Sequence, residues 1–295
     1  MAETRRSPLD ALLDSYAACG GINHLQGANL PSRAAVGALT EELLHLLFPG
    51  FFSGQALAPR EVPAFLSGLL DSLRPRLEVE IAKSLEFAAP GGDAAALAED
   101  FLEELAPLRA ILQTDVEAAF DGDPAATSTE EVMLAYPGIE AIAVQRMAHL
   151  LYKKGVPLLP RMMTEWAHGR TGIDIHPGAE IGTHFFIDHG TGIVIGETCK
   201  IGDHAKIYHG VTLGARSTSG GQQLRGRKRH PTLEDHVTIY PGATILGGET
   251  VIGARTVIGG NVWLVQSVPP DSQVILPEQR MQIRNHHAAG GDWEI

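Results

Sequence analysis

Residues 193–214 read IVIGETCKIGDHAKIYHGVTLG, and this segment repeats with a period of six residues. Small or apolar side chains occur in pairs two positions apart, and each pair follows the previous one by six residues. The pairs are Ile193/Ile195, Cys199/Ile201, Ala205/Ile207 and Val211/Leu213. This period differs from the helical spacing found in the preceding half of the chain.

The same repeat extends in both directions from this segment. It begins after Gly172 with Ile173/Ile175, Ala179/Ile181 and Phe185/Ile187, and a two-residue slip at 189–192 follows. It stops at residues 215–229, whose Gly, Gln, Ser and basic side chains cannot form a packed strand. It returns as Val237/Ile239, Ala243/Ile245, Thr250/Ile252, Thr256/Ile258 and Val262/Leu264.

Glycine commonly follows the second aliphatic residue of a pair, as in Ile195-Gly196 and Ile201-Gly202. A short strand with its aliphatic side chain inward, followed by a corner where a small residue costs least, is typical of a parallel β-helix. One coil cannot bury its own face, so the coils must stack and other elements must cap the ends. The alternative, an antiparallel β-sandwich, would need hairpins and strict alternation over longer strands.

From Thr40 to about Gly169, apolar residues recur at helical spacing. The pattern predicts about five to seven helices, which would cap the N-terminal end of the β-helix. Ser128 and Glu131 have the spacing of a capping box. Turn-forming residues at 90–92, 121–124 and 137–138 interrupt the pattern.

The two periods divide the chain into parts and predict an α+β fold, in which an N-terminal all-helical domain precedes a parallel β-helix. The boundaries are 1–35 for a mobile segment, 36–169 for the helical domain, 170–270 for the β-helix with its inserted loop at 215–229, and 271–295 for a flexible tail. The first and last parts contain too little periodic apolar sequence to pack.

Charge and composition exclude several classes of function. The chain has 23 Lys and Arg residues against 35 Asp and Glu residues, a formal charge of −12, so nucleic acid is not the expected partner. No segment has the apolar run of a signal peptide or of a membrane span, so a cytoplasmic protein with no membrane partner is expected. Cys19 and Cys199 lie far apart and suggest neither a disulfide framework nor a thiolate zinc site.

Four motifs, in this order along the chain, resemble the serine acetyltransferase family. They are Gly172-Ile173-Asp174-Ile175-His176-Pro177, the segment 188–198 that reads DHGTGIVIGET, the segment 211–214 that reads VTLG, and Arg229-His230-Pro231. A single hexapeptide coil is shared by many acyltransferases, whereas the ordered set is specific. The resemblance covers roughly residues 115–272. It implies a left-handed parallel β-helix and the transfer of an acetyl group from acetyl-CoA to L-serine, the first step of cysteine biosynthesis.

The chemistry of this reaction needs a base, because a serine hydroxyl is a poor nucleophile at neutral pH. His189 is the candidate for that base. By resemblance, Asp174 is its acidic partner and would hold one ring nitrogen protonated so that the other faces the substrate. Direct attack within a ternary complex suffices, since the thioester is already activated, and neither an acyl-enzyme nor a metal is expected.

Recognition of serine calls for an anionic subsite for its ammonium and a cationic subsite for its carboxylate. By resemblance, Asp123 and Asp188 form the first subsite, and Arg229 and His230 form the second. The family also implies that L-cysteine acts as a feedback inhibitor at the same site.

The binding site for acetyl-CoA is less visible in the sequence. In hexapeptide transferases the pantetheine is held largely by backbone groups along the coils, and small residues fit this role. The candidates are Gly242, Ala243, Gly259 and Gly260. Two departures from the family bear on CoA binding, namely the longer loop between Leu213 and His230 and the atypical stretch at 273–277.

The resemblance also implies partners. The chain ends on Ile295 after Asp292 and Glu294. In the family, a C-terminal isoleucine that follows acidic residues inserts into the active site of O-acetylserine sulfhydrylase, the next enzyme of cysteine synthesis. The family further suggests homotrimers, paired through the helical domains into hexamers.

Three other functions fit part of the pattern. His184/His189 and His204/His209 have the five-residue separation seen in β-helix zinc carbonic anhydrases. The acceptor of an acetyltransferase could instead be homoserine, a sugar or an antibiotic, although two aspartates suit an ammonium better. A β-helix that serves only as an assembly scaffold would leave Asp174, Asp188 and His189 without a role.

Overall fold

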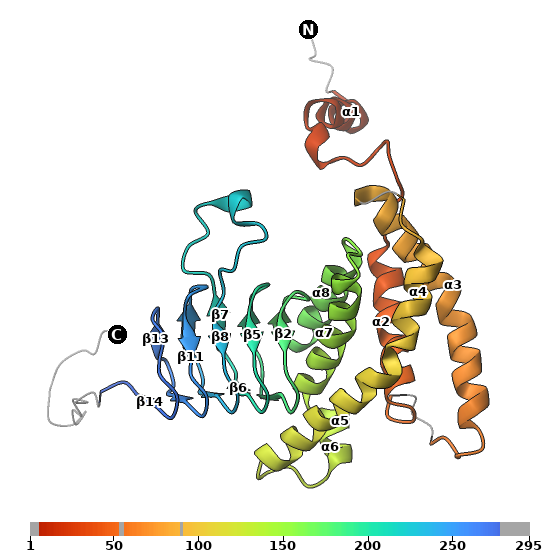
Figure 1. Ribbon diagram of the computed structural model, residues 1–295. Coiled ribbons are helices and arrows are strands. Elements are labelled where there is room, and N and C mark those ends of the chain that lie inside the picture. The colour runs from red at the N-terminus through yellow and green to blue at the C-terminus, as the bar shows by residue number, and fades with distance from the viewer. Residues whose placement is uncertain (1–5, 53–55, 89–90, 278–295) are drawn as a thin grey trace, which may run out of the picture.

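The computed structural model describes residues 6–52, 56–88 and 91–277. Within them, the chain forms a helical region followed by a solenoid of short strands (Figure 1). The helices are α1 Pro8–Ala18, α2 Arg33–Leu47, α3 Val62–Ala88, α4 Ala94–Glu103, α5 Leu105–Gly122, α6 Thr129–Ala135, α7 Pro137–Lys153 and α8 Leu159–Thr171. None of these described helices combines the length and the hydropathy that a bilayer span requires.

Helices α2, α3, α4, α5, α7 and α8 pack around a common apolar core, as the helical spacing predicts. Its fully buried side chains include Leu43, Leu47, Leu73, Leu77, Ile81, Phe101, Leu112, Met147, Leu151 and Leu159. The predicted cap at Ser128 is present, because its hydroxyl accepts the backbone N–H of Glu131 at 3.1 Å and begins α6. The Glu131 carboxylate turns instead to the backbone N–H of Thr127, so only half of the capping box forms.

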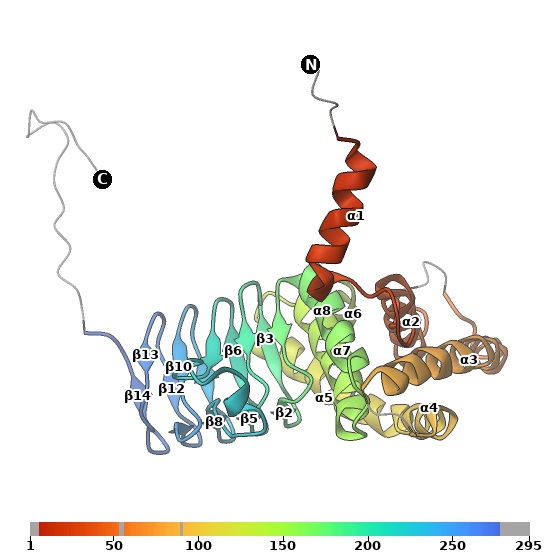
Figure 2. The ribbon, with the colours of Figure 1, turned by 90° about the horizontal axis from the view of Figure 1, so that it is seen from above.

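Helix α1 was not anticipated by the sequence prediction, which assigned residues 1–35 to a mobile segment. Ser7 caps the helix by accepting the N–H of Asp10, and Pro8 occupies its first turn, where a missing N–H costs nothing. None of its residues is buried, and it projects away from the remaining helices (Figure 2). Its apolar side chains Leu9, Leu12, Leu13 and Tyr16 are therefore exposed.

The solenoid is a parallel β-helix of about five coils, which confirms the predicted fold class. Its strands are β1 Asp174–Ile175, β2 Glu180–Ile181, β3 Phe186–Asp188, β4 Val194–Ile195, β5 Lys200–Ile201, β6 Lys206–Tyr208, β7 Thr212–Gly214, β8 Thr232–Leu233, β9 Thr238–Ile239, β10 Thr244–Leu246, β11 Val251–Ile252, β12 Val257–Ile258, β13 Trp263–Leu264 and β14 Gln273–Val274. All pairings between these strands are parallel.

The strands stack into three sheets, one for each side of the coil. Sheet A has the order β1-β4-β7-β10-β13, sheet B has β11-β8-β5-β2, and sheet C has β14-β12-β9-β6-β3. A coil passes from sheet A to sheet B to sheet C, and then returns to sheet A one layer further on. We name the three edges of the solenoid the A–B, B–C and C–A corners.

The inward-facing pairs of the repeat fill the interior, and two details differ from the sequence prediction. After the inserted loop the repeat resumes at β8, where Leu233 is 1% exposed, and not first at Val237. The predicted β-helix ends at residue 270, whereas β14 adds Gln273 and Val274 to sheet C. The loop at 215–229 projects from the A–B corner between β7 and β8 and contains one short 3₁₀ helix, Gly221–Leu224 (Figure 1).

A buried ion pair joins the helical region to the first coil. The guanidinium of Arg146 on α7 donates two hydrogen bonds to Asp115 on α5, at 2.8 and 2.9 Å. It also donates to the backbone oxygens of Ile181 and Gly182, and Asp115 accepts the N–H of Phe185 at 2.9 Å. Burial is the largest influence on Asp115 and raises the pKa of its carboxyl, although Arg146 acts in the opposite direction. Because every polar atom of this cluster points at a partner from another element, the cluster fixes the helices against the solenoid.

Candidate functional site

His189 and Asp188 lie together at the C–A corner of the first coil. Asp188 ends β3, and His189 follows in the left-handed region with φ of 60°. The imidazole is 72% exposed, and its Nε2 lies 3.6 Å from Oδ1 of Asp188. The ring of His209 from the next coil stands edge-on to it, with 5.5 Å between ring centroids. The corner therefore presents an accessible imidazole beside a carboxylate.

Asp123 reaches the same corner from the helical region. It follows the end of α5, where its carboxylate accepts the hydroxyl of Tyr136 at 2.5 Å and the N–H of Ala125 at 2.8 Å. These bonds, led by that from Tyr136, hold the pKa of Asp123 below its ordinary value, and the positive charge of Lys206 acts in the same direction. The hydrogen bond to Asp123 in turn raises the pKa of Tyr136 to about 12. Asp123 is thus an anion held near His189.

Arg229 and His230 lie at a different place, the A–B corner, where the inserted loop rejoins the solenoid before β8. The guanidinium of Arg229 pairs with the carboxylate of Glu197 from the preceding coil. The backbone N–H groups of Arg229 and His230 donate to the hydroxyl of Thr198 at 2.9 and 3.1 Å. The two residues are therefore fixed by the corner segment that precedes Cys199.

The imidazole of His230 is 8% exposed and has a defined role in its hydrogen bonds. Its Nδ1 accepts the backbone N–H of Thr198 at 3.0 Å, so the proton of the neutral ring is on Nε2. Burial, followed by the positive charge of Arg229, lowers the pKa of His230 to about 4. Near neutral pH, His230 is an uncharged donor beside a permanently charged guanidinium.

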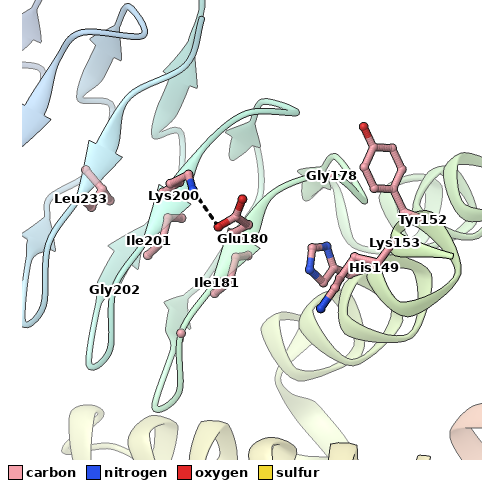
Figure 3. Close-up of a pocket in the computed structure, with 11 residues that line it drawn as sticks. His149, Tyr152, Lys153, Gly178, Glu180, Ile181, Lys200, Ile201, Gly202 and Leu233 are labelled. Atoms are coloured by element: carbon pink, nitrogen blue, oxygen red, sulfur yellow. Dashed lines mark ion pairs between the residues drawn. The ribbon is translucent and has the colours of Figure 1, made fainter. Parts of the chain in front are cut away.

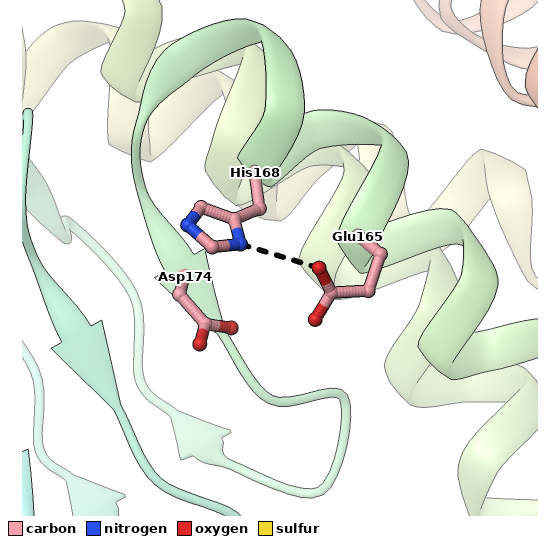
Figure 4. Close-up of side chains that lie close together, drawn as sticks. All are labelled: Glu165, His168 and Asp174. Atoms are coloured by element: carbon pink, nitrogen blue, oxygen red, sulfur yellow. Dashed lines mark hydrogen bonds and ion pairs between the residues drawn. The ribbon is translucent and has the colours of Figure 1, made fainter.

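Asp174 lies on β1 of sheet A, and the structure does not bring it against His189. Its Oδ1 accepts a hydrogen bond of 3.0 Å from Arg161 on α8, and Arg161 also pairs with Glu165. Figure 4 shows Asp174 next to Glu165 and His168, which share a hydrogen bond of 3.2 Å. Ligand atoms of these three residues lie within 4.8 Å of one another, the spacing that a metal ion would need. The guanidinium of Arg161 already pairs with both carboxylates, so we assign no ion to the cluster.

The four residues predicted to contact CoA gather at the C–A corner, further along the solenoid from His189. Gly242 has φ of 71°, and an added Cβ would collide with Asn261. Ala243 is completely buried, so only its backbone could meet a ligand. Gly259 follows β12, and an added Cβ at Gly260 would lie 3.2 Å from the oxygen of Pro241. The corner is thus lined by small residues, as backbone recognition requires.

The predicted base and the residues predicted to bind serine form two groups on different corners of one chain. The first group, at the C–A corner, is Asp123, Asp188 and His189, and the second, at the A–B corner, is Arg229 and His230. Sheet A separates them: four residue steps from Gly192 to Gly196 span about 13 Å at the usual strand rise. A serine molecule is only a few bonds long, so within one chain it cannot contact both groups.

The alternative zinc site also divides between corners. His189 and His209 lie at the C–A corner, whereas His184 and His204 lie at the B–C corner with their rings stacked 4.1 Å apart. The stack continues to His236, at 4.5 Å. All three members of the stack have positive φ, a conformation in which histidine is enriched. In one chain, the four histidines of the zinc hypothesis thus cannot share an ion.

A cavity of about 880 Å³ lies between α7 and sheet B (Figure 3). It is lined by His149, Tyr152, Lys153, Gly178, Glu180, Ile181, Gly182, Lys200, Ile201, Gly202 and Leu233. None of the residues predicted to act on serine or CoA belongs to this wall. The predicted site residues therefore lie outside this cavity.

The sequence analysis did not identify the residues that form hydrogen bonds to the predicted site residues. Tyr136 is 13 positions from Asp123 and belongs to no motif, so no signal in the sequence pointed to it. Glu197 and Thr198 stand inside a motif that carried the family resemblance, and this was the available signal. Ile295, predicted to bind a partner, lies outside the described residues.

Comparisons with known proteins agree with the motifs. No family model matches the chain. It is 43% identical over 277 residues to a serine acetyltransferase, plasmid, of Synechococcus elongatus, covering 89% of this chain and 86% of that protein. It is 44% identical over 186 residues to a serine acetyltransferase of Mycobacterium tuberculosis, covering 62% of this chain and 78% of that protein.

Solved structures show the same similarity. The chain matches serine acetyltransferase isoform 3 of Entamoeba histolytica in complex with cysteine, with a TM-score of 0.73 and 34% identity over 94% of each chain. It also matches a serine acetyltransferase of Neisseria gonorrhoeae in complex with serine, with a TM-score of 0.55 and 27% identity, covering 88% of this chain and all of that one. The helical region and the solenoid are both included in these matches.

Proposed function

The chain belongs to the serine acetyltransferase family, and from this premise we propose that its two groups of corner residues form one site for L-serine between neighbouring copies of the chain. It is an acetyltransferase that uses acetyl-CoA as co-substrate. The proposed reaction converts acetyl-CoA and L-serine into CoA and O-acetyl-L-serine, the first step of cysteine biosynthesis. One observation carries the proposal. The anionic residues Asp123 and Asp188 lie beside His189 at one corner, and the cationic residue Arg229 lies beside His230 at another.

His189 acts as the general base of this reaction. Its imidazole accepts the proton of the serine hydroxyl while the hydroxyl oxygen attacks the thioester carbon. The C–S bond then breaks, and the imidazolium returns the proton to the sulfur of CoA. In the proposed mechanism, Asp174 keeps the second ring nitrogen of His189 protonated, which requires the two side chains to turn toward each other because they are not in contact in this structure. Since Arg161 engages Oδ1 of Asp174, the other carboxylate oxygen would meet the ring.

The charges of the two groups match the two ends of serine. Asp123 and Asp188 receive the ammonium, and the lowered pKa of Asp123 keeps its carboxyl charged. Arg229 receives the carboxylate with a charge-assisted hydrogen bond, and His230 adds the N–H of its Nε2. Because His230 is neutral, its N–H orients the serine carboxylate without adding a second positive charge beside Arg229.

A closed oligomer supplies both groups to each site. In a homotrimer, the C–A corner of one copy meets the A–B corner of the next, and the contact repeats around a threefold axis. Three equivalent sites result. Two such trimers would pair through their helical domains into a hexamer.

L-Cysteine fits the same site as an inhibitor. It carries the same ammonium and carboxylate as serine and differs only at the side-chain sulfur. Related serine acetyltransferases from Entamoeba histolytica have been solved in complex with cysteine. Inhibition should therefore be competitive with serine.

Acetyl-CoA lies along the C–A corner in this proposal. The backbones of Gly242, Ala243, Gly259 and Gly260 line its path toward His189, and the stacked coils offer groups at regular spacing. The small side chains there leave room for the pantetheine arm.

The choice of acceptor tests the proposed reaction. Release of CoA thiol from acetyl-CoA should be rapid with L-serine and much slower with L-homoserine, whose hydroxyl lies one methylene farther from the two charges. It should be absent with a simple sugar, which carries neither charge. The measurement is the thiol released per minute at equal acceptor concentrations. A rate with the sugar that matches the rate with serine would contradict the assignment of the acceptor.

The C-terminal residues carry a second proposed interaction. We infer that Ile295 inserts into the active site of O-acetylserine sulfhydrylase, where its carboxylate occupies the place of the substrate's carboxylate. Asp292 and Glu294 add negative charge suited to an anion-binding cleft.

A peptide of the last ten residues tests this interaction. It should bind the sulfhydrylase and lower its activity, whereas the same peptide without Ile295 should not. Fluorescence titration of the sulfhydrylase with each peptide measures the difference. Equal affinities would show that the terminal isoleucine is not the anchor.

A further inference from the structure

Gly196-Glu197-Thr198 belongs to a motif that resembles the family, yet the proposed reaction gives it no role. The segment occupies the A–B corner of the second coil, between β4 and β5. Arg229 and His230 arrive at this corner from the inserted loop at 215–229, most of whose residues are exposed. Gly196, Glu197 and Thr198 therefore form the surface against which Arg229 and His230, the pair proposed to bind the carboxylate of serine, are packed.

Each residue of the segment holds a different part of the pair. Gly196 lies against the imidazole of His230, and a Cβ at this position would overlap the ring. The hydroxyl of Thr198 accepts the backbone N–H groups of both residues and lies 2.9 Å from Nδ1 of His230. The carboxylate of Glu197 accepts the guanidinium of Arg229.

Glu197 has a second partner on the helical region. Its Oε1 accepts the hydroxyl of Tyr152 on α7 at 2.8 Å, while Oε2 serves Arg229. Only about a fifth of the Glu197 side chain and a quarter of the Arg229 side chain are exposed, at 21% and 24%. Figure 3 shows Tyr152 at the end of α7, beside the corner that follows β1.

The charge of Glu197 is secured by these contacts. Burial opposes its ionisation, but the hydrogen bonds from Arg229 and Tyr152 outweigh that effect and lower the pKa of Glu197. Tyr152 remains a donor, because burial and its bond to Glu197 raise its pKa to about 12. Glu197, held in place by Tyr152, is therefore a fixed acceptor for one edge of the Arg229 guanidinium.

We infer that Glu197 and Tyr152 are positioning residues for the carboxylate of serine, acting through Arg229. Glu197 fixes the direction of the guanidinium, and Tyr152 fixes Glu197 against α7. The inference rests on the proposed function, because it assumes that Arg229 receives the carboxylate. A guanidinium at the end of a loop would otherwise lose more conformational entropy when serine binds.

The test separates the two substrates. Glu197→Gln leaves one acceptor oxygen and no charge, so it cannot accept hydrogen bonds from both partners. It should raise the KM for serine by about tenfold or more, since hydrogen bonds to charged groups are the stronger ones. Tyr152→Phe removes a single hydrogen bond and should raise the same KM by about fivefold. The KM for acetyl-CoA and kcat should remain within about twofold in both variants, and inhibition by cysteine should weaken in parallel with serine binding.

Combining the substitutions gives a readout that a purely structural role would not produce. Because Tyr152 acts through Glu197, the double variant should match Glu197→Gln alone and not multiply the two effects. Glu180→Gln is the matched control, since it removes a surface carboxylate paired with Lys200 and should change neither KM. Multiplying effects, or equal rises in KM for both substrates, would overturn the inference.

Arg229→Ala distinguishes failure of the inference from failure of the proposed function. If Arg229→Ala raises the KM for serine and Glu197→Gln does not, then Glu197 does not position Arg229 and only the inference is wrong. If Arg229→Ala leaves the KM for serine unchanged, the carboxylate subsite itself is misplaced, and both statements fall. Tyr152→Phe removes one oxygen atom, so its effect can be measured in a folded enzyme even if Glu197→Gln is unstable.

Discussion

Replacing His189 with asparagine should lower kcat by about 10²- to 10⁴-fold, the range that general-base catalysis supplies. Asparagine is the better test than alanine because His189 has φ of 60°, a conformation that asparagine tolerates and alanine does not. The backbone of the corner should then persist while the base is lost. Asp174→Asn should cause a smaller loss, since the base remains and only its orientation suffers.

His204→Asn provides the matched control for this prediction. His204 has φ of 58° and occupies the equivalent position on the B–C corner, outside the proposed site. Steady-state kinetics at saturating concentrations of both substrates, with circular dichroism to verify folding, would compare the variants. A folded His189→Asn enzyme with kcat near that of His204→Asn would exclude His189 as the base.

The coil pattern could be predicted from the sequence because its cause is local. Each inward pair must fill one side of a coil, so the spacing of aliphatic residues reports the coil directly. The prediction missed Leu233 because the inserted loop hides where the period resumes and because Pro231 takes the place of a small or aliphatic residue. The last strand was missed for a similar reason, since Pro269 and Pro270 interrupt the approach to Gln273.

The contacts between distant segments could not be predicted from the sequence. Asp115 and Arg146 form a buried pair across 31 positions, and nothing in either surrounding sequence specifies the other. Two hydrogen bonds are similar cases, because each joins a tyrosine hydroxyl to a carboxylate for which the motifs indicated no partner. They are the bonds from Tyr136 to Asp123 and from Tyr152 to Glu197. Such pairs depend on how the helices dock onto the first coils, which a periodic pattern does not describe.

The division of the predicted serine-binding residues between two corners is the structural result with the largest consequence. Family motifs name Asp174, His189 and Arg229 without saying that sheet A separates the last two. In the structure, Asp174 is engaged by Arg161, and Arg229 is engaged by Glu197. A site between neighbouring copies accounts for this separation without moving either anchored residue.

The expected consequence is that two inactive variants complement each other when they assemble into one oligomer. His189→Asn removes the base from one corner, and Arg229→Ala removes the carboxylate contact from the other. In a trimer that contains both variants, a site can combine His189 from one copy with Arg229 from the next. With equal amounts and random assortment, about one quarter of the sites should be intact.

The most direct measurement mixes these two variants in one oligomer. The chains are coexpressed with different affinity tags, purified through both tags, and assayed for thiol release at a serine concentration well below the KM of the Arg229→Ala enzyme. Purification through both tags removes the homotrimers, and every remaining mixed trimer has one intact site out of three. The mixed trimer should therefore recover about one third of wild-type activity, while each variant alone stays almost inactive. A mixed oligomer no more active than the two separate variants would show that one chain supplies both groups and would contradict a site formed between copies.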